Sequence, residues 1–349
     1  MTSPPPPGVG PNADALANTA RVAAEQVVAQ QVGQVATFLA GGGLASESVD
    51  DLSWQVNRLA EIARLRRQLA LSSREATKAA TAQVPGMLAD VAQRAAGGLD
   101  VQVQTLTEDL VGALIRMWSG LPTLLTGKAE IIVISAASQV RVGNLTRVQA
   151  TAQAADRMVA QGIAPARDRA GRQWTAPAYT EMIVRTSVMD AGRTGRETQA
   201  VRFGTPYVQV SDALRECPMC RPWEGKILTL DGTDPEGIAQ GTLAEARAAG
   251  LGHPNCRHLW AGYFPAYSSR VQPTPDSAGW EASKRQRELE RRVRAAKLRQ
   301  QTAETIDPGG LTAQAAKTRV RDAQRQLREH VKATGQRRKP DRERVPQAS

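Results

Sequence analysis

Ten of the thirteen aromatic side chains of this 349-residue chain lie between Trp174 and Trp280. Before them the chain offers only Phe38, Trp54 and Trp118, and the sequence there is rich in Ala, Gln, Val and Leu. Small side chains let helices approach closely, but they bury little apolar area per residue. The composition of the first 170 residues therefore predicts helices rather than a conventional compact core. They also argue against one compact enzyme that spans the whole chain.

Hydrophobic spacing supports helices in this N-terminal part. Apolar residues that follow one another by three or four positions form one helix face, and here they are Leu52, Val56, Leu59, Ile62, Leu65 and Leu69. Glycine and proline breaks divide the region into several helices. We expect a disordered Pro-rich lead over residues 1–11, an elongated helical region over 12–160 and a polar linker over 161–173.

The sequence changes character after the linker. We expect one helix from Ala178 to Val201 and two short strands, Tyr207–Val210 and Lys226–Leu230, the second closed by an Asp-Gly turn. Residues 174–279 are thus predicted to form a small α+β domain. Two helical stretches separated by Asp-Pro-Gly-Gly then predict a helical hairpin over 280–335, and residues 336–349 are expected to be flexible.

The positive charge belongs to the end of the chain. The formal net charge is +11, and the segment 281–349 carries nineteen Lys/Arg against nine Asp/Glu, a net of +10. Such a basic hairpin is suited to phosphates, through counterion release, or to an acidic protein surface; the solvated face of a charged helix is the plainer alternative. The candidate contact residues are Arg287, Arg291, Arg294, Lys297, Arg321, Arg325 and Arg328.

Several protein classes are excluded by simple features. The longest apolar run, near Ile131–Ile134, is far shorter than the ~18–20 residues of a membrane span. The first residues lack the basic and apolar regions of a secretory signal, so none is expected. Three cysteines cannot form a closed disulfide framework, which favours a reduced compartment.

The strongest local signal is a Cys/His cluster. Cys217 and Cys220 form a Cys-x-x-Cys pair, and His253, Cys256 and His258 follow about 35 residues later. Three cysteines and one histidine are a donor set that structural zinc prefers. Five candidates compete for four positions, so either His253 or His258 is spare. Reduced cysteines packed in a small domain are the alternative.

Catalytic interpretations of this cluster are weaker. A zinc deaminase needs His-x-Glu, which the chain lacks. A zinc-framed His/Asn/His nuclease has candidates in His253, Asn255 and His258. The lone acids Glu216 and Glu224 are expected at the surface, and Arg185 is expected to be a solvated or helix-pairing arginine. The aromatic residues Trp223, Trp260, Tyr263 and Tyr267 are expected to form the core around the cluster.

Three segments together resemble the phage minor capsid protein 2 family, a relative of the Mu F-type head-morphogenesis proteins. The first is the Arg185-Thr186 helix, the second holds the Cys217–Cys220 and Gly252–His258 motifs, and the third is the basic hairpin with its Thr334-Gly335 end. They occur in order between about residues 175 and 345. The N-terminal helical region resembles the family only in its general composition and helical pattern.

The resemblance implies a non-enzymatic structural virion protein of a tailed phage, present in few copies. Its partners would be the portal protein, other capsid or scaffold proteins and packaged DNA through the basic hairpin, with no membrane. It would lie in the capsid interior or at the portal vertex, and in the host cytoplasm during assembly. Because the family allows His or Cys at the position of His258, the resemblance favours Cys217, Cys220, Cys256 and His258 as structural zinc ligands, with His253 as second choice.

The combined prediction is a mainly α fold: an elongated helical N-terminal region, a small α+β zinc-knuckle-like domain and a basic helical C-terminal hairpin. The predicted function is head morphogenesis, with DNA packaging or delivery. The alternatives are a zinc-framed His/Asn/His nuclease and a basic DNA-binding protein.

Overall fold

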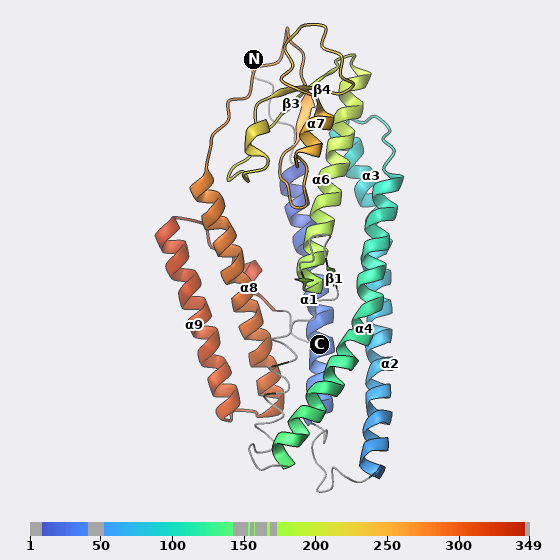
Figure 1. The fold of residues 1–349 in the computed structure, drawn as a ribbon, viewed down its shortest axis with the longest axis vertical. Helices are drawn as coiled ribbons and strands as arrows, with labels where there is room; N and C mark the ends of the chain where they lie inside the picture. The colour runs from blue at the N-terminus through green and yellow to red at the C-terminus, as the bar shows by residue number, and fades with distance from the viewer. Residues whose placement is uncertain are drawn as a thin grey trace. The chain divides into compact units, whose positions relative to one another are not determined.

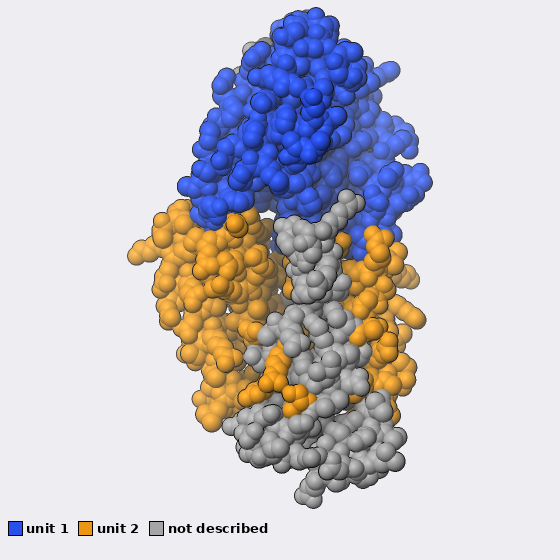
Figure 2. Space-filling model, in the orientation of Figure 1, with its two compact units in different colours: residues 1–20, 80–114, 180–283 blue, residues 21–79, 115–179, 284–349 orange. Residues whose placement is uncertain are grey.

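A computed structural model describes residues 9–40, 52–141, 153, 157, 166–167 and 173–345. Parts of the expected lead, helical region, linker and tail lie outside these residues, namely 1–8, 41–51, most of 142–165, 168–172 and 346–349. The described chain forms two compact units, each assembled from separate segments of the sequence (Figure 2). Unit 1 comprises residues 1–20, 80–114 and 180–283, and unit 2 comprises 21–79, 115–179 and 284–349.

Helices dominate the chain (Figure 1). They are α1 (Val9–Ala40), α2 (Leu52–Ala82), α3 (Val84–Ala95), α4 (Gln104–Arg141), α6 (Ala176–Arg202), α7 (Leu243–Ala248), α8 (Ser277–Ile306) and α9 (Leu311–Thr334), with short 3-10 helices η1 (Arg221–Trp223) and η2 (Pro340–Glu343). The mainly helical fold class with a small sheet beside the Cys/His cluster is confirmed. Because α1 begins at Val9, the last three residues of the expected lead are helical.

Unit 1 packs helices through small side chains. Gly195 of α6 lies against α3 so closely that a Cβ atom there would be 2.2 Å from the carbonyl oxygen of Ala92. Ala92 and Ala95 are buried at this crossing. The alanine-rich composition thus serves close helix approach, as the sequence indicated.

The sheet of unit 1 is antiparallel, in the order β4-β3-β5. Its strands are β3 (Tyr207–Val210), β4 (Ile227–Thr229) and β5 (Trp260–Gly262), and Val208 pairs with both Leu228 and Gly262. All four residues of β3 are buried, as the central strand of a covered sheet requires. A capping box, in which Thr242 and Glu245 bond each other's backbone N–H, starts α7 beside the sheet.

Unit 2 contains the basic hairpin. Helices α8 and α9 lie side by side (Figure 1) and share a buried cluster of Leu289, Val293 and Leu327. In the same unit Gln31 of α1 donates to Ser73 of α2 at 2.9 Å. A two-stranded ladder pairs β1 (Ala166–Arg167) with β2 (Gln173–Trp174).

The segment after α9 is packed against α8, although the sequence suggested a flexible end from residue 336. Gln286 donates to the carbonyl of Arg337 at 3.0 Å, and Lys297 donates to that of Glu343 at 2.7 Å. Arg338 forms two 2.6 Å hydrogen bonds with the Glu343 carboxylate, which is buried. Charged side chains therefore order this segment, and hydrophobicity alone could not reveal it.

Among the residues that the structure describes, no helix is long and apolar enough to span a membrane.

Candidate metal centre

Two loops of unit 1 bring the predicted donor residues together. Cys217 and Cys220 lie on the tight turn that leads into η1, where the N–H groups of Cys220 and Arg221 both donate to the carbonyl of Cys217. His253 and Cys256 lie on the loop after α7, where the Cys256 N–H donates to the His253 carbonyl at 2.8 Å. His258 precedes β5, so the sheet fixes one end of this second loop.

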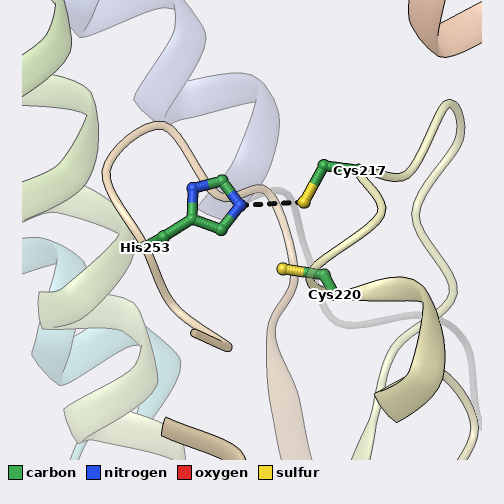
Figure 3. Close-up of side chains that lie close together, drawn as sticks. All are labelled: Cys217, Cys220 and His253. Carbon is green, nitrogen blue, oxygen red and sulfur yellow. Dashed lines mark hydrogen bonds between the residues drawn. The ribbon is translucent and has the colours of Figure 1, made fainter. Parts of the chain in front are cut away.

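The donor atoms form two overlapping groups that share Cys220. One group is Cys217, Cys220 and His253, and the other is Cys220, Cys256 and His258; within each group the donor atoms lie within 4.8 Å of one another. Figure 3 shows the first group, in which Cys217 Sγ lies 2.9 Å from His253 Nε2 and Cys220 points toward the same space. In the second group, Cys256 Sγ lies 3.6 Å from both Cys220 Sγ and His258 Nδ1.

Electrostatics favour thiolates in this cluster. The Cys220 thiol hydrogen-bonds to both neighbouring sulfurs, which lowers the pKa of Cys217 to about 4 and that of Cys256 to about 3. The same bonds raise the pKa of Cys220 itself. The pKa of His253 is raised mainly by its contact with Cys217. A divalent cation would replace the protons between these atoms, since metal ligands must be deprotonated.

Each histidine has its other ring nitrogen held by an oxygen. His258 Nε2 lies 2.7 Å from Glu224 Oε1, and His253 Nδ1 lies 2.8 Å from the carbonyl oxygen of Pro254. Burial lowers the pKa of His258, but hydrogen bonds with Cys256 and Glu224 outweigh it and raise the pKa overall. Oxygen acceptors of this kind orient metal-bound histidines in proteins.

Helix α6 holds the second loop by its Arg-Thr pair. Arg185 donates to the side-chain oxygen of Asn255 at 2.9 Å, and Thr186 accepts the Asn255 N–H at 3.1 Å. Asn255 has a φ of 66°, a left-handed conformation that asparagine tolerates better than most residues. Arg185 is buried and pairs with Asp14 of α1 and with Glu181 of its own helix, so the helix-pairing alternative is confirmed and the solvated one is wrong.

A second arginine of α6 holds the backbone of the same loop. Arg193 is 1 % exposed and donates to the carbonyl oxygens of Cys256 and His258 at 3.2 and 2.8 Å. Its guanidinium lies 5.1 Å from the ring centre of Trp260, whose other contact of this type is Arg247 at 5.2 Å. The sequence does not single out Arg193, because arginines are frequent in this chain and their spacing does not indicate which of them are buried.

The structure places the acids differently from the sequence expectation. Glu216 and Glu224 were expected at the surface, yet they are 2 % and 5 % exposed. Glu216 pairs with Arg221 and accepts the Asp276 N–H, while Glu224 contacts His258 and accepts the Ala213 N–H. Single acids give no periodic signal, so only the fold reveals these partners.

The aromatic expectation is correct except at one position. Trp260 and Tyr263 are buried and Trp223 packs partly against the core. Tyr267 is 88 % exposed, so its prediction as a core residue is wrong. It lies in the turn that follows β5, beyond the reach of the sheet.

The basic candidates of the hairpin are not equivalent. Arg294 pairs with Glu25 and donates to the Arg342 carbonyl, and Lys297 donates to the Glu343 carbonyl, so both serve contacts within unit 2. Arg287 is half-buried. The remaining candidates are exposed, namely Arg291, Arg321, Arg325 and Arg328.

The cluster is better suited to holding structure than to hydrolysis. His258 is 2 % exposed with both ring nitrogens in contacts, and the Asn255 side chain is held by Arg185. A hydrolytic centre must admit substrate and keeps an open coordination position, whereas structural zinc sites are closed. This geometry favours the structural alternative over a His/Asn/His nuclease.

Comparison with known proteins gives one match. The family model described as phage minor capsid protein 2 matches residues 125–332, which is more than half of the chain and includes the Arg-Thr helix, the Cys/His cluster and most of the basic hairpin. No curated protein and no solved structure matches the chain.

Proposed function

This chain belongs to the phage minor capsid protein 2 family, and from that premise we propose that it works at the portal vertex of a tailed-phage head. There it assists head assembly and DNA packaging or delivery as a structural component rather than an enzyme. The single observation that carries this proposal is the family match over residues 125–332. Membership of the family supports a location in the virion beside other virion proteins. The more specific placement at the portal vertex is what we propose.

The Cys/His cluster fits the role of a structural zinc site. The ligands are Cys217, Cys220, Cys256 and one histidine, a donor set of the structural kind. Such a site adds rigidity to a small domain, because metal binding free energy is folding free energy. The sheet and α6 would then form a firm platform for contacts with the portal or other head proteins.

Immunogold electron microscopy of purified virions tests the location. An epitope tag inserted after Ser349 is expected to place gold at one vertex of opened particles. A tag on the major capsid protein, which should label the whole shell, is the matched control. Label spread evenly over the shell, or absent from particles whose tagged protein is expressed, would contradict a role at the portal vertex.

The basic hairpin supplies a surface for packaged DNA on α9. Five exposed cations, Lys317, Arg321, Arg325, Arg328 and Lys332, recur every three or four residues. At 3.6 residues per turn they fall within an arc of about 80° over a length of about 22 Å. Arg325 also pairs with Asp322 on the same helix. A row of cations of this length matches a run of phosphates on duplex DNA, which supports the DNA-binding part of the proposal.

Charge reversal on α9 tests this surface. The triple variant Lys317→Glu, Arg321→Glu and Arg328→Glu should weaken binding to linear duplex DNA and reduce the slope of log K against log salt by about 2–3, since each phosphate contact contributes about 0.9. The matched control reverses the same charge at exposed Arg64, Arg67 and Arg74 of α2. Equal losses in both triples would show that net charge, and not the α9 face, governs binding.

A further inference from the structure

Two histidines stand beside three cysteines, and a tetrahedral site has room for one of them. The contacts of the two rings differ in length. Cys217 Sγ and His253 Nε2 are 2.9 Å apart, while Cys256 Sγ is 3.6 Å from His258 Nδ1 and 3.6 Å from Cys220 Sγ.

Coordination geometry distinguishes these lengths. With Zn–S near 2.3 Å and Zn–N near 2.0–2.1 Å, neighbouring donors of a tetrahedral site lie roughly 3.6–3.8 Å apart. Cys256 already has this spacing to both Cys220 and His258. The Cys217–His253 distance is that of a hydrogen bond, too short for two ligands of one ion.

The surroundings of the rings differ as well. His258 is buried and faces the carboxylate of Glu224, which is itself 5 % exposed. Its carbonyl is anchored by Arg193, so both ends of the residue are fixed. His253 is partly exposed, and the acceptor for its second nitrogen is the neutral carbonyl of Pro254. A carboxylate raises the basicity of a ligating imidazole more than a neutral carbonyl does.

Resting on the proposed zinc site, we infer that His258 is its nitrogen ligand, with Cys217, Cys220 and Cys256, and that Glu224 is the residue that positions it. His253 contacts Cys217 from outside the ligand set and stabilises that thiolate. Glu224 holds the Nε2–H of His258, which directs Nδ1 toward the sulfurs. One oxygen of Glu224 has no hydrogen-bond partner, and the other contacts only His258 and the Ala213 N–H, so His258 is the side chain that this carboxylate holds.

Cobalt spectroscopy and chelator competition test the assignment on the full-length protein. Wild-type protein and His253→Ala are expected to show the intense d–d bands of tetrahedral Co²⁺, and His258→Ala is expected to lose them. His258→Cys, which offers a thiolate at the same position, should restore tetrahedral binding with stronger sulfur-to-metal charge transfer. Circular dichroism of each variant verifies that the helices are retained.

Glu224→Gln tests the positioning residue. It is expected to weaken Zn²⁺ binding about 10- to 100-fold, the effect of losing a carboxylate behind a ligating histidine, while the tetrahedral cobalt spectrum stays. Glu216→Gln removes an equally buried carboxylate that contacts Arg221 instead, and should leave the affinity unchanged.

Each contrary result overturns a different statement. Loss of the cobalt spectrum in His253→Ala and its retention in His258→Ala would show that His253, not His258, is the nitrogen ligand. Equal Zn²⁺ affinity of Glu224→Gln and wild type would show that Glu224 does not position the ligand. If wild-type protein binds neither Co²⁺ nor Zn²⁺, the proposed zinc site itself fails, and the assignment fails with it.

Discussion

Replacing Cys220 with alanine is expected to abolish stoichiometric zinc binding and to unfold the sheet region of unit 1. Cys220 is fully buried and belongs to both donor groups, so no choice of histidine can compensate for its loss. A ligand that binds only the folded state stabilises it by about 4 kcal/mol at 1,000 times its Kd. We therefore expect Cys220→Ala to lose at least roughly this much.

Metal analysis and thermal unfolding measure the effect. Removal of zinc from wild-type protein by a strong chelator should lower the melting temperature to near that of the variant, and added Zn²⁺ should restore it. Met219→Ala, at the exposed neighbouring position, should retain zinc and change stability by only about 0.5 kcal/mol. Wild-type protein whose melting temperature changes neither on removal of zinc nor on addition of Zn²⁺ would disprove a structural metal site.

Arg193→Ala is expected to destabilise unit 1 by about 1–3 kcal/mol, the cost of leaving buried hydrogen-bond acceptors without a partner. The substitution leaves Asp190 and the carbonyl oxygens of Cys256 and His258 without their donor. Burial already raises the pKa of Asp190, so the loss of the guanidinium leaves this carboxylate poorly compensated. The loop that carries two of the proposed ligands should loosen as a result.

Arg247→Ala is the matched control, because Arg247 also lies over Trp260 at nearly the same distance. Its side chain is 48 % exposed and pairs with Glu197, so about 0–1 kcal/mol is expected. Denaturant unfolding of the three proteins gives the free energies. Similar losses in both variants would mean that contact with the indole ring, rather than the buried hydrogen bonds of Arg193, stabilises the loop.

Local sequence signals identified most of the elements. The expected helix from Ala178 to Val201 is α6, the strand Tyr207–Val210 is β3, and the Asp-Pro-Gly-Gly break separates α8 from α9. These predictions succeed because periodicity and turn residues act over a few neighbouring positions. The packed segment from residue 336 was missed because its order depends on charged contacts with α8, about 50 residues away in sequence.

The metal cluster was predicted in part. Cysteine and histidine spacing identified the five residues that the fold brings together, because residue pairs on tight turns leave a local pattern. Glu224, Arg185 and Arg193 leave no such pattern, since each acts across the fold on a loop at least 34 residues away. Their burial also reverses the ordinary expectation that single charged residues are solvated.

By itself the sequence determined that this chain is mainly helical, that its basic charge is concentrated at the end, and that three cysteines and two histidines form one cluster. It also carried the family resemblance, which the family match confirms. Only the tertiary structure decided which basic side chains are exposed and which are engaged in contacts within the protein. Arg294 and Lys297 are occupied within unit 2, whereas Lys317, Arg321, Arg325, Arg328 and Lys332 of α9 are exposed along one face. The physical reason is that a charge pattern along the chain does not specify which side chains find a partner, and that depends on segments brought together by folding.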